Sequence, residues 1–144
     1  MKRNLIGILS LVVLAVLISS TGAFAQAYAK ATVPFAFNVG SAQLPAGTYE
    51  IKVENTSAGA IQIRNGETSD SALSITRYET PRNTSAKLVF HRVGNHYFLA
   101  EVWKGPDADG MIVPTCKQEK ELEKELRASN GHSGGYEEVV VALN

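Results

Sequence analysis

The stretch AKLVFHRVGNHYFLAEVWK, residues 86–104, decides the fold of this chain. Two runs of β-branched and aromatic residues flank Gly94 and Asn95, a pair suited to the two-residue turn of a β-hairpin. The turn also sets the register, in which the opposed pairs are Val93 with His96, Arg92 with Tyr97, and Phe90 with Leu99. This stretch therefore predicts two paired strands at the centre of a sheet.

Alternation assigns the side chains of this hairpin to two faces. One face is predicted to carry Leu88, Phe90, Arg92, Tyr97, Leu99, Glu101 and Trp103, and the other Val89, His91, Val93, His96, Phe98, Ala100 and Val102. Both faces are substantially apolar, so we expect both to be covered. A second sheet would cover one of them, and a different element would cover the other.

Further short strands, separated by turns, are expected along the rest of the chain. Alternating apolar residues mark one strand in residues 31–40 and another in LPAGTYEIKVE, residues 44–54, where Tyr49, Ile51 and Val53 face the core. Shorter runs follow at residues 60–64 and 72–78. The near-continuous apolar run 139–143 predicts a final strand that is buried on both sides. It should pair with an earlier strand, for which the first strand is a candidate.

One helix is predicted between residues 114 and 131. Thr115 begins a capping-box pattern, and the Asn-Gly pair at 130–131 is a C-terminal stop signal. Leu122 and Leu126 form only a narrow apolar stripe, so the helix is expected to lie on the surface. Together these elements predict a mainly β chain: an antiparallel β-sandwich or partly closed barrel of about seven strands, with one C-terminal helix before the last strand.

The first residues read as a secretory signal peptide. A basic start at Lys2 and Arg3 precedes a short apolar run, and Ala23-Phe24-Ala25 fits a small-x-small cleavage site. The apolar run is shorter than the ~20 residues that span a bilayer. We therefore expect residues 1–25 to be a signal peptide and residues 26–144 a single β domain, secreted to the periplasm or the extracellular space with no membrane attachment after cleavage.

Charge and cysteine usage limit the partners. The chain has 14 Lys+Arg and 14 Asp+Glu residues, scattered rather than clustered, so no electrostatic signal points to nucleic acid. Cys116 is the one cysteine, which excludes an intramolecular disulfide. It is expected to be a semi-buried residue of the first helical turn, and a disulfide-linked dimer through Cys116 stays open. A protein or small-molecule partner is expected, its identity unknown.

Most of the familiar catalytic motifs are missing from the sequence. It contains no P-loop, G-x-G-x-x-G, H-E-x-x-H or C-x-x-C pattern. In the expected hairpin His91 lies diagonal to His96, but their shared face offers no third metal ligand. We therefore predict no catalytic residues, no metal site and no cofactor.

Four residues of the hairpin are the candidate binding residues. Arg92, Tyr97, Glu101 and Trp103 would share the first face among apolar neighbours, a mixture that suits a small polar or aromatic ligand if that face lines a cavity. The alternative is a core face whose charges pair with each other or emerge at the strand ends.

Several segments resemble known proteins. VPFAFNVGSAQLPAGTYEI (residues 33–51), KLVFHRVGNHYFLAEVW (residues 87–103) and the Lys/Glu-rich helix resemble a group of small secreted bacterial β-domain proteins of unknown function. LPAGTYEIKV (residues 44–53) is also similar to a strand of PEGA-like and transthyretin-like sandwich modules. The resemblance implies a β-sandwich and brings no catalytic or binding residues.

These observations favour an exported, non-enzymatic binding or structural module. One alternative is a small-ligand carrier with a pocket on the face of the 88–103 hairpin. The other is an unrecognised hydrolase, which would need a second acid or a histidine within hydrogen-bond reach of Glu101 or His91.

Overall fold

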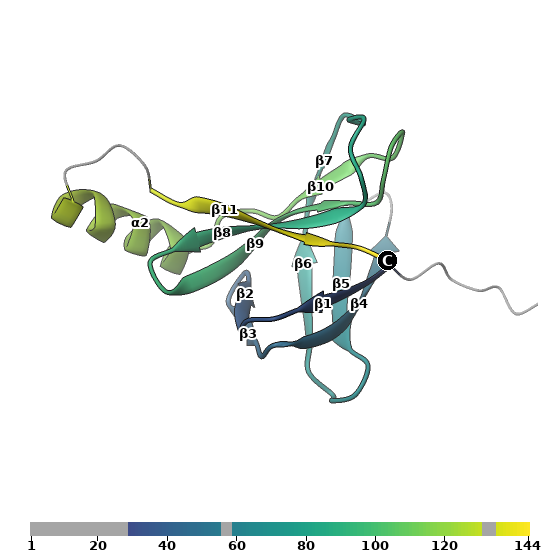
Figure 1. The fold of residues 1–144 in the computed structure, drawn as a ribbon, viewed down its shortest axis with the longest axis horizontal. Coiled ribbons are helices and arrows are strands. Elements are labelled where there is room, and N and C mark those ends of the chain that lie inside the picture. The colour runs from purple at the N-terminus through teal and green to yellow at the C-terminus, as the bar shows by residue number, and fades with distance from the viewer. Residues whose placement is uncertain (1–28, 56–58, 131–134) are drawn as a thin grey trace, which may run out of the picture.

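Two sheets curl toward each other in the computed structural model, which describes residues 29–55, 59–130 and 135–144 (Figure 1). The first sheet has the strand order β1-β4-β5-β6 and the second the order β11-β8-β9-β10-β7, with β2 paired to β9 and β3 paired to β2. The strands are β1 (Ala29–Val33), β2 (Phe37–Val39), β3 (Ala42–Leu44), β4 (Gly47–Asn55), β5 (Ala60–Asn65), β6 (Ser71–Ile75), β7 (Arg77–Glu79), β8 (Lys87–Val93), β9 (His96–Trp103), β10 (Gly110–Ile112) and β11 (Glu137–Ala142). The helix is α2 (Lys117–Asn130).

The two sheets are joined at two corners. At the first corner the chain passes from β6 to β7 through Thr76, whose N–H and hydroxyl both donate to the carbonyl of Gly59. At the second, Asn144 and Lys30 exchange two backbone hydrogen bonds of 2.9 and 3.2 Å, so the end of the chain pairs with β1. Because both corners are tied, the sheets form a half-barrel around one core.

Side chains from both sheets fill this core. Tyr49 and Phe90 are each fully buried, and Phe37 lies between them with ring centroids 5.1 and 5.2 Å away. Edge-to-face arrangements of this kind stabilise beyond the area that they bury. The other members of the cluster are mainly aliphatic and include Val33, Leu44, Ile51, Ile61, Ile63, Leu88, Leu99, Val102 and Met111.

The predicted fold class is confirmed: the chain is mainly β, with one helix before the last strand. The predicted hairpin register is confirmed as well, since Val93 pairs with His96, Arg92 with Tyr97 and Phe90 with Leu99. The described strands outnumber the expected seven because four of them are short pairings of only three residues, β2, β3, β7 and β10.

Two strand predictions need correction. Residues 31–40 do not form one strand, because the chain leaves β1 after Val33 and crosses to β9 before β2 begins at Phe37. The final strand is not buried on both sides, since Val140 is 55% exposed. Along its length β11 pairs with β8, and the backbone hydrogen bonds to β1 come from Asn144 beyond it.

Strand β6 has an unusual polarity. Leu73 and Ile75 are 67% and 72% exposed, while the smaller Ala72 and Thr76 are buried. Large aliphatic side chains therefore face solvent at the edge of the first sheet.

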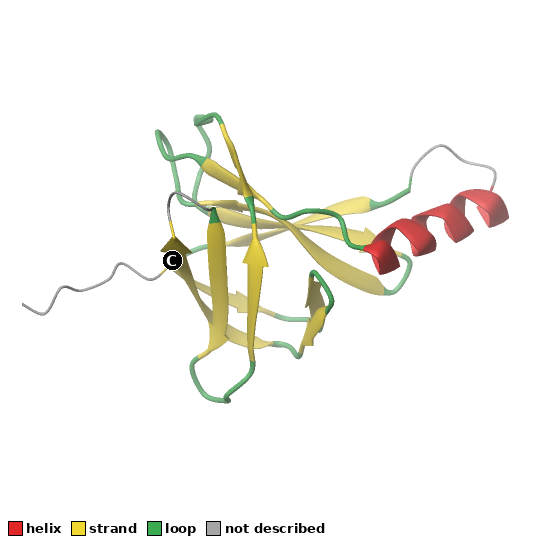
Figure 2. Ribbon diagram, turned by 180° about the vertical axis from the view of Figure 1, so that it is seen from behind, coloured by secondary structure: helices red, strands yellow, loops and turns green. Residues whose placement is uncertain are grey.

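The helix begins and ends close to its predicted limits. The carbonyl of Cys116 accepts a hydrogen bond from the Lys120 N–H, so the helix starts after Cys116, and it ends at Asn130 as the stop signal predicted. Figure 2 shows α2 at the hairpin end of β8 and β9, covering neither sheet in full. Within the described residues, no helix combines the length and the apolar character that crossing a membrane requires.

Candidate functional site

A β-bulge separates the four candidate binding residues. The hairpin pairing is regular from its turn to Phe90 and Leu99, but Val89 then lies opposite Glu101. Ala100 is the extra residue of β9, and one extra residue exchanges the faces of everything that follows it. Leu88 therefore pairs with Val102 in the core, and Glu101 lies on the opposite face.

The prediction that all four candidate residues share one face is therefore wrong. Arg92 and Tyr97 lie on the face that Phe90 and Leu99 occupy, whereas Glu101 and Trp103 lie on the other. A hydrogen bond of 2.6 Å runs from Trp103 Nε1 to a Glu101 carboxylate oxygen. Glu101 therefore satisfies the indole N–H of a tryptophan that is otherwise buried.

Arg92 and Tyr97 lie together at the start of β11. The ring of Tyr97 stacks on Phe35 with centroids 3.9 Å apart, and the Arg92 guanidinium carbon lies 5.9 Å from the Tyr97 centroid. Arg92 also forms an ion pair of 3.3 Å with Glu137. These two candidates lie opposite each other on β8 and β9, and Arg92 also reaches the first residue of β11.

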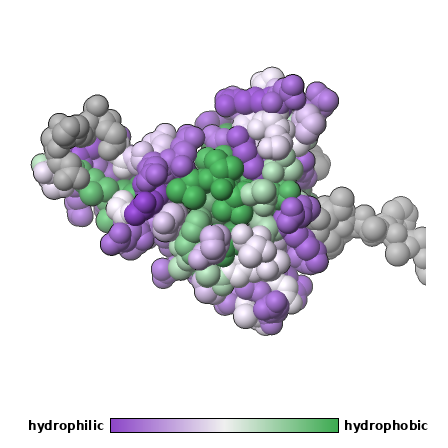
Figure 3. All heavy atoms as spheres, in the orientation of Figure 1, coloured by the Kyte–Doolittle hydropathy of each residue, from purple (hydrophilic) through white to green (hydrophobic). Residues whose placement is uncertain are grey.

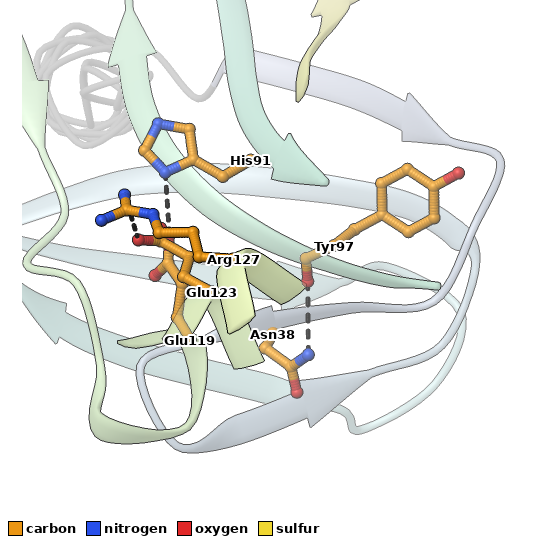
Figure 4. Close-up of polar contacts among 6 residues, drawn as sticks. All are labelled: Asn38, His91, Tyr97, Glu119, Glu123 and Arg127. Carbon is orange, nitrogen blue, oxygen red and sulfur yellow. Dashed lines mark hydrogen bonds and ion pairs between the residues drawn. The ribbon is translucent and has the colours of Figure 1, made fainter. Parts of the chain in front are cut away.

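A polar cluster joins β8 to α2 (Figure 4). His91 Nδ1 lies 2.8 Å from Glu119 Oε1, and the two side chains are only 17% and 5% exposed. One helical turn later, Glu123 pairs with Arg127 at 3.5 Å. The ring of Tyr136 stacks on the imidazole at 3.8 Å. His91 is thus held between the helix and the segment that leads into β11.

Three of these side chains offer metal-ligand atoms. His91 Nδ1 and one carboxylate oxygen each of Glu119 and Glu123 all lie within 4.8 Å of one another. Histidine and glutamate are ligands that divalent cations accept in proteins. In the structure these atoms already have protein partners, since His91 is bonded to Glu119 and Glu123 to Arg127.

The sequence pattern does not predict this cluster. His96 shares a hairpin face with His91, but the residue that bonds to His91 is Glu119 of the helix. The available signal was that Glu119 is three residues before Leu122 and seven before Leu126, so all three lie on one helix face. A glutamate on the only apolar stripe of a helix is expected to be buried with a partner.

The tip of the hairpin and the helix border an open groove of about 430 Å³. Its residues are Val93, Gly94, Asn95, His96, Leu122, Glu125, Leu126 and Ser129. Gly94 lies beside Leu126, and a Cβ added to the glycine would lie 3.8 Å from the leucine methyl. The groove is mostly apolar at its base and carries one acid, Glu125, and one imidazole, His96.

The edge of β11 presents an apolar surface. Val140 is more than half exposed, and its neighbours Val139 and Val141 are only partly buried against the core. Figure 3 shows a hydrophobic area near the middle of the face on which β11 crosses the molecule. Because β11 is the last strand of its sheet, these three valines lie along an open strand edge.

Cys116 is a free, half-buried thiol at the start of α2, as expected for a semi-buried residue. The dimer through Cys116 remains a prediction.

Comparisons with known proteins add no identification: no family model, no curated protein and no solved structure matches the chain. Fold and site geometry together define a half-barrel β domain with a helix joined to its central hairpin.

Proposed function

We propose that this chain is an exported, non-enzymatic binding module. The signal-peptide pattern of residues 1–25, which lies outside the described residues, supports export. The observation that carries the binding role is the edge of β11, where Val140 is 55% exposed on a strand that ends its sheet. Apolar surface on an open strand edge is an established site for association with a partner chain.

Site-specific photo-crosslinking tests the binding role. A benzophenone amino acid in place of Val140 should crosslink to a partner when the protein is exported by its own host. The same group in place of Thr48, an exposed residue of the polar face of β4, is the matched control. Equal yields at the two positions, or no adduct at position 140, would exclude a binding surface at β11.

Export has an independent test. N-terminal sequencing of the protein collected outside the cytoplasm should begin at Gln26 or within a few residues of it. An intact Met1 would contradict the signal-peptide prediction.

The small-ligand carrier is supported by one observation, the groove between the hairpin tip and α2. Its volume of about 430 Å³ lies within the range of ligand pockets. Its lining differs from the candidate set, because it does not include Arg92, Tyr97, Glu101 or Trp103. An apolar fluorescent dye should bind the wild type more strongly than a Leu126→Glu variant if the groove holds ligands, and equal binding would exclude it.

The hydrolase alternative gains the carboxylate that it required, since Glu119 lies within hydrogen-bond reach of His91. To act as the general base of a hydrolase, His91 would also need a nucleophile to activate. The described contacts of His91 are with Glu119 and the ring of Tyr136, and neither side chain is a nucleophile of the required type. Hydrolysis of an activated ester that disappears in His91→Ala but persists in His96→Ala would favour the enzyme.

A further inference from the structure

We propose that the occupant of the β11 edge is an extended peptide segment of a partner protein, which adds to the second sheet as an antiparallel strand. The segment would carry apolar side chains at alternate positions and basic residues at its C-terminal end, beside Glu137 and Glu138. This inference rests on the proposed binding function and specifies the partner.

The backbone of β11 is oriented to accept a strand. The N–H of Leu143 donates to the carbonyl of Ala86 at 3.1 Å, in the same register that pairs β11 with β8. Hydrogen-bonded positions alternate along an antiparallel ladder. The backbone groups of residues 137, 139 and 141 therefore point to β8, while those of Glu138, Val140 and Ala142 point away from it.

Asn144, two residues beyond β11, confirms this alternation on the same side of the chain. Asn144 belongs to the same outward-pointing set, and its N–H and carbonyl both bond to Lys30 of β1. Such a reciprocal pair is the antiparallel arrangement. β1 and β11 then diverge from this contact (Figure 1). Among the described residues, no backbone partner is found for Glu138, Val140 or Ala142.

Most of the edge lacks the features that usually block strand addition. Proteins protect open edges with charged side chains, proline or a bulge, and the charges of β11 are confined to its first two residues. β11 has the sequence EEVVVA and an unbroken register with β8. Its three valines offer apolar contacts on both faces, with Val140 on one face and Val139 and Val141 on the other.

Charge selects the kind of strand that fits. Glu137 and Glu138 open β11; Arg92 pairs with the first, and no described ion pair involves the second. In an antiparallel complex the C-terminal end of the added strand lies beside these acids, so basic residues there are favoured. A second copy of β11 brings no such complement, because the strand contains no basic residue.

Two synthetic peptides test the proposal on the full folded protein. Both alternate valine and threonine, and they differ only in carrying two lysines at the C-terminal or the N-terminal end. The first should bind at least several-fold more tightly, and amide exchange at Glu138, Val140 and Ala142 should slow on binding. Methylating alternate peptide amides should abolish binding.

Val140→Pro is the decisive variant. It removes an N–H that points away from β8, so the fold tolerates it, as edge strands tolerate proline. Binding should fall at least tenfold, whereas the matched Val140→Thr variant keeps the N–H and should bind within a few-fold of wild type. Leu73→Pro, on the open edge of β6, should leave binding unchanged.

Four results would overturn the inference. Unchanged peptide binding by Val140→Pro would exclude the β11 edge. Loss of binding in Leu73→Pro would assign the strand to β6 instead. A dimer that forms without peptide and disappears in Val140→Pro would make a second copy the occupant. A crosslink at position 140 without amide protection by either peptide would leave the proposed binding function standing and refute strand addition alone.

Discussion

His91 Nδ1 lies 2.8 Å from Glu119 Oε1, and this contact joins the middle of β8 to the first turn of α2. The helix has few other means of attachment. Leu122 and Leu126 are its inward apolar residues, and both are only half-buried. A buried carboxylate must have a partner to be tolerated. The position of the helix therefore depends on this polar pair as well as on the leucines.

We expect His91→Ala to lower the free energy of unfolding by about 3 kcal/mol, because it leaves the Glu119 carboxylate buried without its partner. Glu119→Gln retains a hydrogen-bonding side chain and should cost about 1 kcal/mol. Urea denaturation measures both values. The control is His96→Ala, since His96 is exposed. A loss in His96→Ala as large as that in His91→Ala would contradict the structural role of the pair.

The same cluster makes a prediction about metals. Since His91, Glu119 and Glu123 already have protein partners, we expect a chelator to leave the Tm of the purified protein unchanged. Added Zn²⁺ should also leave Tm unchanged. A stabilisation by Zn²⁺ that disappears in Glu123→Gln would instead establish a three-ligand metal site.

Gly110 allows the close approach of a tryptophan. A Cβ at Gly110 would lie 2.5 Å from Trp103 Cη2, and the indole is fixed by its hydrogen bond to Glu101. Gly110→Ala should therefore destabilise by about 1–3 kcal/mol through overpacking. Gly66→Ala is the matched control, because a Cβ there meets nothing within 4 Å. Thermal unfolding compares the two, and equal effects would show that the Trp103 contact is not the cause.

The hairpin register, the buried face of β4 and the end of the helix could be predicted, because each depends on residues that are close in the sequence. The turn at Gly94 and Asn95 gave the hairpin register as far as Phe90, since turn geometry fixes pairing near the turn. Tyr49 and Ile51 are buried as their alternation predicted. The helix ends at Asn130 because its stop signal is local.

The candidate site was less predictable because it depends on long-range geometry. The bulge at Ala100 has no marker in the sequence, and it moved Glu101 and Trp103 to the other face. The burial of Glu119 depends on how α2 lies against β8, which no helical periodicity determines. Likewise, the exposure of Val140 depends on whether another element covers the outer face of β11, which a run of valines cannot indicate.

The pH dependence of stability should be affected by Tyr49. Its hydroxyl donates to the Pro45 carbonyl at 2.6 Å inside the core. Burial raises the pKa of Tyr49 above the ordinary value of 10.0; the negative charge of Asp70 adds to this, and a side-chain hydrogen bond with Asn65 opposes it. The unfolded chain therefore loses this proton at a lower pH than the folded chain. The stability that Tyr49 contributes is complete below pH 10 and falls as the pH rises through the folded pKa.

Tyr49→Phe isolates this effect. At neutral pH it should cost about 1 kcal/mol, because the Pro45 carbonyl loses its donor. Above pH 10 the wild type should lose stability faster than the variant, by up to about 1.4 kcal/mol per pH unit between the unfolded and folded pKa. Denaturant unfolding at several alkaline pH values measures the difference. Parallel curves for wild type and Tyr49→Phe would show that Tyr49 ionises alike in both states.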